Sequence, residues 1–215
     1  MFDLALRQVK ERALKPICSV VPQWLTPIHL TFLAFLAGIS SCYAAAFTTN
    51  QSYALSLWAL NRFFDSLDGS LARFRGVATE TGGFLDLLGD FIVYSLIPIS
   101  VAIGQSPHSF VHWTAVSLLE ASFHINNFVL LYIAAVEAKR ANRARELTSL
   151  SMEPSLVEGL ESAIFFTLML LLPSYINLLS WVMCAAVMVG VVQRTASLVS
   201  VLSRIELDAG EGKEK

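Results

Sequence analysis

The sequence contains few charged residues. Asp, Glu, Lys and Arg make up only 15% of the chain and hydrophobic residues make up 55%, whereas a soluble domain carries about 25% charged residues. A soluble fold of 215 residues with this composition would lack the polar side chains needed to cover its surface. We therefore expect an integral membrane protein. The net charge of −2 gives no indication of a nucleic-acid partner.

Cysteine is also scarce. Cys18, Cys42 and Cys184 lie far apart and form neither a CxxC motif nor a metal-binding spacing, which argues against a disulfide framework. A cleaved signal peptide is not expected, because no short apolar core precedes a small-residue cleavage site. No linker or internal repeat divides the chain, so we expect a single membrane domain over residues 1–205, followed by a polar tail over residues 206–215.

Six stretches are apolar enough to cross a bilayer, which takes about 20 residues. They are residues 30–47, 53–74, 83–103, 110–136, 156–173 and 176–202. The pattern predicts an all-α fold, a bundle of six transmembrane helices.

Three of the connections between these stretches contain no Lys or Arg: TTNQS, GQSPHS and LPSYIN. All 15 Lys and Arg lie before the first stretch, near the turn between the second and third (Arg62, Arg73 and Arg75), after the fourth, or towards the C-terminus. Positive residues concentrate on the cytoplasmic side of membrane proteins. The distribution therefore predicts that both termini are cytoplasmic.

The first 22 residues form an amphipathic pattern. Apolar residues recur at spacings of three and four, with Arg and Lys between them. These apolar residues are Phe2, Leu6, Val9, Ala13 and Ile17. Such a pattern is typical of a helix that lies in the membrane interface.

Residues 63–91 place four aspartates in this apolar chain, in the pattern D-x2-D-G-x2-A-R-x8-G-x3-D-x3-D. Asp65 and Asp68 are three residues apart, and Asp86 and Asp90 are four apart, so each pair shares one face of a helix. Because two helices joined by a short turn run antiparallel, we expect the two pairs to meet at the cytoplasmic end of the bundle.

Four carboxylates at close range repel one another unless cations bind between them. Hard divalent cations, Mg²⁺ or Mn²⁺, are the expected occupants, and two metals held by carboxylates suit displacement at phosphorus. Gly69 and Gly82 would let a diphosphate approach the helices closely. Arg73 could contact a phosphate. The aspartate least committed to metal could remove a proton from an attacking hydroxyl.

At every fixed position the motif resembles the signature of the CDP-alcohol phosphotransferase family. The segment TPIHLT also resembles the family's Pro-Asn-x-x-Thr element, keeping Pro27 and Thr31 but with Ile28 in place of Asn. The likeness is specific over residues 27–98 and architectural beyond them. It implies six transmembrane helices, an N-terminal interfacial helix and a homodimer.

The resemblance also implies roles for particular residues. Two Mg²⁺ or Mn²⁺ ions would be bound by Asp65, Asp68, Asp86 and Asp90, with Asp90 also the general base. The CDP site would be lined by Gly69, Ala72, Arg73 and Gly82, with Thr31 as a further candidate. In the implied reaction, the hydroxyl of a small polar acceptor attacks the phosphorus attached to the lipid alcohol of a CDP-alcohol, most commonly CDP-diacylglycerol. CMP is released and a phosphodiester forms, as a step of phospholipid biosynthesis.

Several alternatives stay open. The aspartates could instead form the pathway of a small cation- or proton-coupled transporter. In the fourth stretch, four polar residues could lie at an acceptor or metal site, or could make interhelical hydrogen bonds or a dimer contact. They are Glu120, His124, Asn126 and Asn127. Glu158 and Glu161 could be helix-dipole partners or line a cytoplasmic cavity. The basic run from Lys139 to Arg145 could face lipid headgroups or bind a phosphorylated acceptor. The acceptor itself is not specified.

Overall fold

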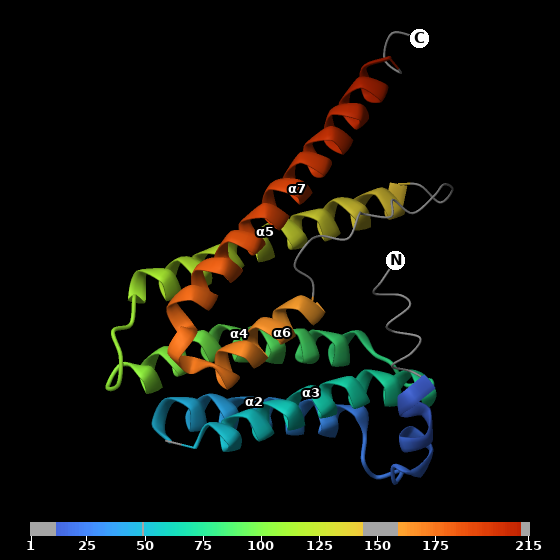
Figure 1. Cartoon of the computed structure of the whole chain (residues 1–215). Coiled ribbons are helices and arrows are strands. Elements are labelled where there is room, and N and C mark those ends of the chain that lie inside the picture. The colour runs from blue at the N-terminus through green and yellow to red at the C-terminus, as the bar shows by residue number, and fades with distance from the viewer. Residues whose placement is uncertain (1–11, 49, 144–158, 212–215) are drawn as a thin grey trace. The chain divides into compact units, whose positions relative to one another are not determined.

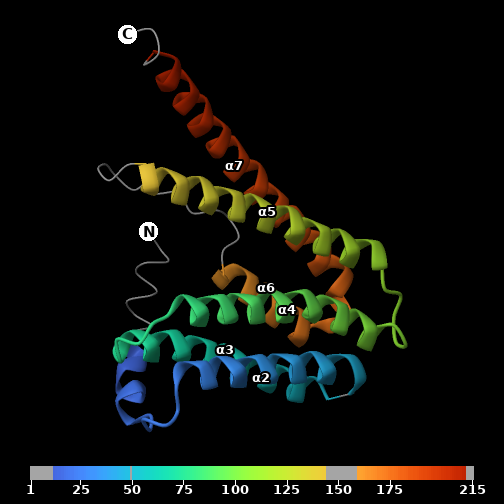
Figure 2. The same cartoon turned by 180° about the vertical axis from the view of Figure 1, so that it is seen from behind.

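The computed structural model describes residues 12–48, 50–143 and 159–211, with side chains described for all of these except residues 137–143, 159–160 and 204–211 (Figures 1 and 2). Every regular element in these residues is helical, which confirms the predicted all-α fold. A first helix spans residues 12–20. The others are α2 (Pro27–Phe47), α3 (Gln51–Phe74), α4 (Glu80–Gln105), α5 (Trp113–Arg143), α6 (Gly159–Leu171), the 3-10 turn η1 (Pro173–Tyr175) and α7 (Ile176–Glu211).

Four of the described helical segments are long and apolar enough to cross a membrane: α2, α4, residues Trp113–Val136 of α5, and Pro173–Ser203. α3 is not among them, because the ionised side chains of the motif lie along it. α6 is apolar, but its 13 residues are fewer than the roughly 20 needed to span. The protein is therefore an integral membrane protein, and the count of six spans stays a prediction.

Polar caps fix where the helices around the motif begin. Thr26, Asn50 and Thr79 precede α2, α3 and α4, and each side-chain oxygen accepts a hydrogen bond from the backbone N–H three residues further on. Such caps satisfy N–H groups that have no partner within the helix. Gly76, with φ of 66°, lies in the turn between α3 and α4 and adopts a left-handed conformation that glycine reaches at little cost. The turn that carries the two aspartate pairs into proximity is thus encoded locally.

The described residues form two compact units. The first contains those within 12–112 and 164–177, and the second contains 113–143, 159–163 and 178–211. The expected single domain over residues 1–205 stays a prediction. In the first unit, α2 packs along both α3 and α4 (Figures 1 and 2). The buried Ser41 hydroxyl donates to the carbonyl of Ala54 at 2.8 Å, and the Asn61 amide donates to the carbonyl of Ala34 at 2.8 Å.

The helix of residues 12–20 packs against the beginning of α2 and the end of α3. Buried Cys18, Leu30, Leu67 and Leu71 form the centre of this contact, and Ile17 packs against them. Ala13, which the sequence pattern assigned to the apolar face, is exposed. The face that packs on the protein therefore differs from the predicted apolar face. It contacts the end of α3 through Leu14, Ile17, Cys18 and Val21. Placement of the helix in the membrane interface stays a prediction.

The second unit contains α5 and α7. Arg194 of α7 donates to the side-chain oxygen of Asn126 of α5 at 2.5 Å. The thiol of Cys184 lies 3.5 Å from the carbonyl oxygen of Leu118. For Asn126, the structure therefore shows the interhelical hydrogen bond that was one of its two expected roles.

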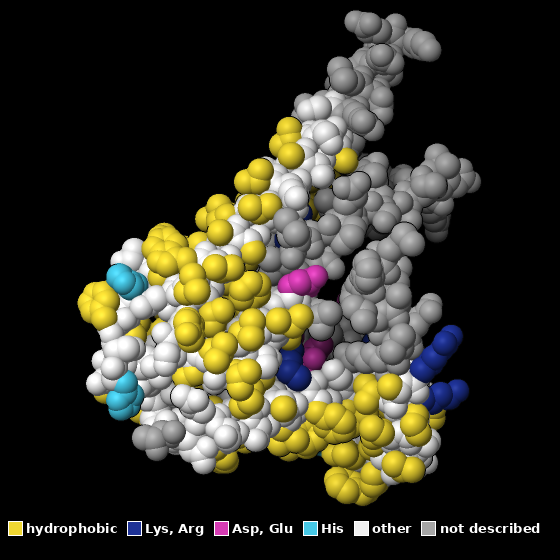
Figure 3. Space-filling view, in the orientation of Figure 1, with side chains coloured by type: hydrophobic (Ala, Val, Ile, Leu, Met, Phe, Trp, Pro, Cys, Tyr) yellow, Lys and Arg dark blue, Asp and Glu magenta, His cyan; other side chains and the backbone are white. Residues whose placement is uncertain are grey.

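Large apolar side chains are exposed on both units, as expected where the surface meets lipid. Among the side chains coloured by type in Figure 3, hydrophobic ones predominate over acidic and basic ones. Near the first helix, Val20 is 77% exposed and Trp24 is 74% exposed. An amphipathic tryptophan at this position suits the boundary between lipid and water.

Candidate active site

The four aspartates come together at the end of the first unit where α3 turns into α4. Asp86 interacts electrostatically with Asp68 and Asp90 and lies within side-chain hydrogen-bond reach of Asp65. This convergence follows from the helical spacing and the short turn, and it confirms the expectation that the two pairs meet.

The carboxylates nevertheless point to different partners. Among the described residues, no three His, Cys, Asp or Glu side chains are close enough to hold a metal ion between them. Asp68 accepts from the hydroxyl of Thr31 at 2.6 Å and from the backbone N–H of Gly69. Asp90 and Asp65 pair instead with Arg62. The four acidic groups are therefore neighbours whose side chains would have to turn towards a common point to share a cation.

A cavity of about 490 Å³ lies beside Asp68 and Asp86. It is lined by Gln23, Thr26, Pro27, Ile28, Thr31, Asp68, Gly69, Ala72, Arg73, Arg75, Val77, Ala78, Thr79, Gly82, Gly83 and Asp86. All five residues predicted for the nucleotide site lie on this wall. Asp65 and Asp90 do not line it, so only half of the acidic group faces the cavity.

The two motif glycines have different surroundings. A Cβ on Gly69 would lie 3.2 Å from a guanidinium nitrogen of Arg73, so the missing side chain makes room for Arg73. A Cβ on Gly82 would meet only the Thr79 hydroxyl, at 3.2 Å. The expected open approach to the helix thus exists at Gly82, whereas at Gly69 the space is next to a cationic side chain.

Arg62 is the residue of this site that the sequence interpretation missed. Its guanidinium lies 2.6 Å from a carboxylate oxygen of Asp90 and 3.5 Å from one of Asp65. It also donates to the Tyr94 hydroxyl at 2.5 Å and to the side-chain oxygen of Asn61 at 2.7 Å. The sequence had placed Arg62 with the cytoplasmic turn, but it precedes Asp65 by one helical turn and faces inward. That i, i+3 spacing was the available signal.

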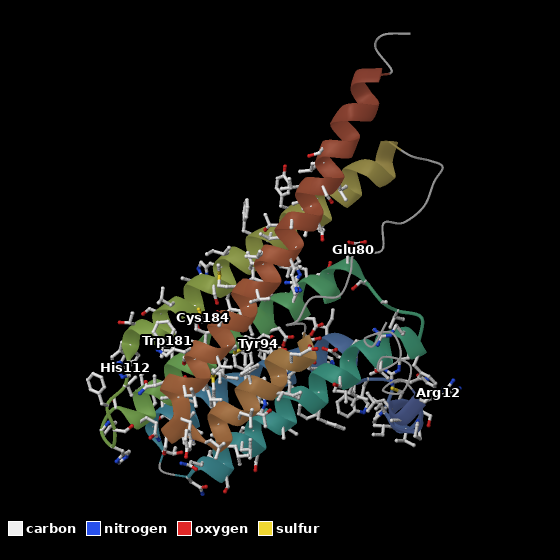
Figure 4. All side chains as sticks on the ribbon, turned by 45° about the horizontal axis from the view of Figure 1, so that its top comes forward. Arg12, Glu80, Tyr94, His112, Trp181 and Cys184 are labelled. Carbon is white, nitrogen blue, oxygen red and sulfur yellow. The ribbon has the colours of Figure 1, made fainter. Side chains whose placement is uncertain are left out.

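Aromatic rings surround the Arg62 guanidinium. It lies 4.7 Å from the ring centroid of Trp58 and 5.0 Å from that of Tyr94, as in cation–π contacts. Tyr94 projects from α4 between the helices (Figure 4), and its ring centroid is 4.9 Å from that of Phe166 in α6. The indole N–H of Trp58 donates to the Thr167 hydroxyl at 2.8 Å. Three helices therefore fix the surroundings of Arg62.

Comparison with known proteins identifies the family to which a chain with this site belongs. The family model described as CDP-alcohol phosphatidyltransferase matches residues 24–192, which include the cavity wall except Gln23, all four aspartates and Arg62. The chain belongs to this family. It is therefore an enzyme of the phosphatidyltransferase type that uses a CDP-alcohol. The family assignment also decides against the transporter alternative.

Two curated relatives of this phosphatidyltransferase are bacterial and archaeal. The chain is 33% identical over 155 residues to inner membrane protein YnjF of Escherichia coli K12, covering 70% of this chain and 72% of YnjF. It is 34% identical over 99 residues to archaetidylinositol phosphate synthase of Pyrococcus horikoshii, covering 46% of this chain and 50% of that protein.

Solved structures of Mycobacterium tuberculosis phosphatidylinositol phosphate synthase (PgsA1) share the fold of this phosphatidyltransferase. The structure with CDP-DAG bound has a TM-score of 0.63 and 18% identity, covering 88% of this chain and 92% of PgsA1. The complex with manganese and citrate has a TM-score of 0.62 and 18% identity, covering 86% and 85%.

The other candidate residues of the phosphatidyltransferase are not among those that line the cavity. Glu120 and His124 lie in α5, in the second unit, and Glu161 lies in the first turn of α6. The position of Glu161 matches a helix-dipole partner. Glu158 and the side chains from Lys139 to Arg145 lie outside the described residues. Ile28 lines the cavity, so an apolar side chain occupies the wall where the family element has Asn.

Proposed function

We propose that this enzyme transfers the phosphatidyl group of CDP-diacylglycerol to the hydroxyl of a small polar acceptor and releases CMP. The observation that carries the proposal is the cavity beside Asp68 and Asp86. It combines an acidic end with a cationic side chain, Arg73, and an open glycine, Gly82. A diphosphate needs all three: cation ligands, a positive side chain and close approach to backbone. CDP-DAG is also what the PgsA1 structure contains.

The residues present fit a divalent metal centre. The donor set consists of carboxylates and the Thr31 hydroxyl, which are the oxygen ligands that Mg²⁺ and Mn²⁺ prefer. We assign Asp65, Asp68, Asp86 and Asp90 as the residues that would hold two ions. When bound, such ions would neutralise the diphosphate and stabilise CMP as the leaving group. The PgsA1 complex with manganese supports this assignment and leaves the choice between Mg²⁺ and Mn²⁺ to experiment.

The chain's own side chains orient the donor in this proposal. Arg73 contacts the diphosphate through its guanidinium. Gly69 gives Arg73 room beside the helix, and Gly82 lets the diphosphate approach α4. Ala72 and Thr31 complete the wall, and the Thr31 hydroxyl holds Asp68 in its rotamer. The lipid tails of the donor stay in the bilayer, while CMP and the acceptor exchange with the aqueous side.

Asp90 takes the proton in the transfer step. The acceptor oxygen attacks the phosphorus attached to diacylglycerol, a new P–O bond forms, and the P–O bond to CMP breaks. The hydroxyl proton moves to the Asp90 carboxylate, and CMP carries away the electron pair of the broken bond. Asp90 is 24% exposed and lies outside the cavity wall, so an acceptor can reach it from a side other than the donor's.

The experiment is CMP release by purified, detergent-solubilised protein given CDP-diacylglycerol and Mg²⁺ or Mn²⁺. The acceptor panel contains serine, glycerol 3-phosphate, inositol and inositol 1-phosphate. The last is included because the relatives are named archaetidylinositol phosphate synthase and phosphatidylinositol phosphate synthase. One acceptor should support release in the wild type and none in Asp90→Asn. Equal release by Asp90→Asn would contradict the role of Asp90. No release with any acceptor, from folded protein, would contradict the donor assignment.

We also propose that the enzyme is a homodimer with both termini in the cytoplasm and six spans. The distribution of Lys and Arg supports the orientation. Reporter fusions at residue 1 and residue 215 should both give cytoplasmic signals, and cross-linking in membranes should yield a dimer. Signals on opposite sides would require an odd number of spans.

A further inference from the structure

We propose that Arg62 is a positioning residue that holds Asp90 for proton removal from the acceptor, and that its guanidinium competes with the metal ions for Asp90 and Asp65. This inference rests on the proposed function, in which Asp90 receives the proton. Arg62 is not one of the fixed positions of the aspartate motif. It is nevertheless the side chain that pairs with two of the four aspartates.

Arg62 divides the four carboxylates into two pairs. Asp68 and Asp86 line the donor cavity. Asp65 and Asp90 lie outside its wall and pair with the guanidinium, at 3.5 Å and 2.6 Å. Like charges at close range destabilise one another, and the guanidinium partly offsets this repulsion for Asp65 and Asp90. It also fixes these two carboxylates beside the pair that lines the cavity.

The contacts of Arg62 favour a fixed guanidinium. Its nitrogens donate to Asn61, Tyr94 and Asp90, and Asn61 is itself anchored to the carbonyl of Ala34. Arginine presents its donors in a rigid fork, so several simultaneous partners fix its plane as well as its position. The Trp58 and Tyr94 rings cover its faces. A group held in this way can hold Asp90 in turn.

Asp90 is held by a second group as well. The Tyr94 hydroxyl, which accepts from Arg62, is also within hydrogen-bond reach of Asp90. One end of the carboxylate therefore contacts Arg62 and Tyr94, while the side chain keeps 24% exposure. A base oriented by neighbouring groups loses less freedom when the acceptor binds, which lowers the barrier to proton transfer.

The test compares Arg62→Gln, Arg62→Lys and Tyr94→Phe with wild type, using Arg12→Gln as a control because Arg12 is exposed on the first helix. Three quantities are measured on solubilised protein: the Kd for Mn²⁺ by titration, the KM for CDP-diacylglycerol, and kcat for CMP release. The Mn²⁺ titration needs no turnover, so it tests the role of Arg62 even if no acceptor supports CMP release. Absence of release in wild type would overturn the proposed function alone.

Arg62→Gln should bind Mn²⁺ at least about tenfold more tightly, because a positive charge beside two ligands is removed. Its kcat should fall by about 10- to 100-fold with KM unchanged, as for loss of a group that orients an active-site residue. Arg62→Lys keeps the charge without the fork, so its Mn²⁺ affinity should stay near wild type while kcat stays low. Unchanged or weaker Mn²⁺ binding by Arg62→Gln, or a raised KM with normal kcat, would overturn the proposal.

Tyr94→Phe keeps the ring and removes one group that contacts Asp90, so it provides the test if Arg62→Gln does not fold. Its kcat should fall while its KM and Mn²⁺ affinity stay at the wild-type values. Wild-type kcat in folded Tyr94→Phe would contradict the claim that Asp90 is positioned from this side.

Discussion

At the scale of single residues, the hydroxyl of Thr31 links α2 to the acidic site. It donates to Asp68 at 2.6 Å and lies on the cavity wall. Asp68 is only 3% exposed. A buried carboxylate depends strongly on its hydrogen-bond donors, because water cannot replace them.

Thr31→Val should therefore lower the affinity for Mn²⁺ and the rate of CMP release by about tenfold, as expected for loss of a group that orients a metal ligand. Valine has nearly the same shape, so the change removes the hydroxyl and little else. Mn²⁺ titration and CMP release measure the effect. Thr31→Ser keeps the hydroxyl and is the control. Wild-type behaviour of Thr31→Val would show that the hydrogen bond to Asp68 has no role in the site.

The residues that could be predicted from sequence are those with a fixed spacing. Asp86 meets the other aspartates because helical periodicity and a short turn determine the faces involved. The spacing of Arg62 and Asp65 indicated their pairing, but the contacts of Arg62 with Asp90 and Tyr94 could not be predicted in the same way. Those contacts depend on the rotation of α3 against α4, which is decided by packing of side chains from several helices. Spacing within one helix does not specify that rotation.

At the scale of elements, α2 and α4 approach each other at glycines. A Cβ on Gly104 would lie 2.2 Å from the backbone oxygen of Ala45, and one on Gly38 would lie 2.6 Å from a methyl carbon of Val93. Small residues allow close helix packing in membranes, where van der Waals contact replaces the hydrophobic effect between helices.

Gly104→Ala should lower the free energy of unfolding by about 1–3 kcal/mol, because the added methyl group meets backbone that cannot rotate away. Thermal unfolding in detergent, followed by loss of monodisperse protein, measures the change. Gly83→Ala is a matched control, since a Cβ there has nothing within 4 Å. Equal stability of the two variants would contradict the close packing of α2 on α4.

Arg75 ties the first helix to the end of α3. Its guanidinium donates to the backbone carbonyls of Leu25 at 2.8 Å, Val21 at 2.8 Å and Pro22 at 3.0 Å. The cavity-lining residues Gln23 and Thr26 lie within this clamped segment. The cavity wall is therefore partly built by the connection between the first helix and α2.

Arg75→Gln should expose Cys18, which is 3% exposed and packed under the first helix. Burial raises the pKa of the Cys18 thiol, so little reactive thiolate forms at neutral pH while the first helix is packed in place. A hydrogen bond from a charged donor contributes about 1.5–3 kcal/mol, so its loss should let the first helix open more often. Alkylation of Cys18 should then become at least about tenfold faster. The measurement uses a Cys42→Ala, Cys184→Ala background, with Arg12→Gln as control. Unchanged alkylation of Cys18 would contradict the clamp.

At the scale of the whole molecule, the predicted all-α fold class is confirmed, and the count of six spans stays a prediction. Apolar runs indicated the helices because each run is as long as a membrane is thick. α3 does not meet that criterion because the charged side chains of the motif lie along it. Some of these side chains face the interior of the unit, where Arg62 pairs with Asp90. Whether such a helix spans the bilayer depends on its packing in the bundle, which hydropathy along one helix does not describe.

The most direct test of the account is the metal dependence of CMP release. Purified protein is stripped with a chelator and given CDP-diacylglycerol and the acceptor found active, and Mg²⁺ or Mn²⁺ is then added back. The account predicts that stripping abolishes release, that either ion restores it in wild type, and that neither restores it in Asp68→Asn. Full release by the stripped protein, or full restoration in Asp68→Asn, would contradict the claim that the aspartates hold metal against the donor's diphosphate.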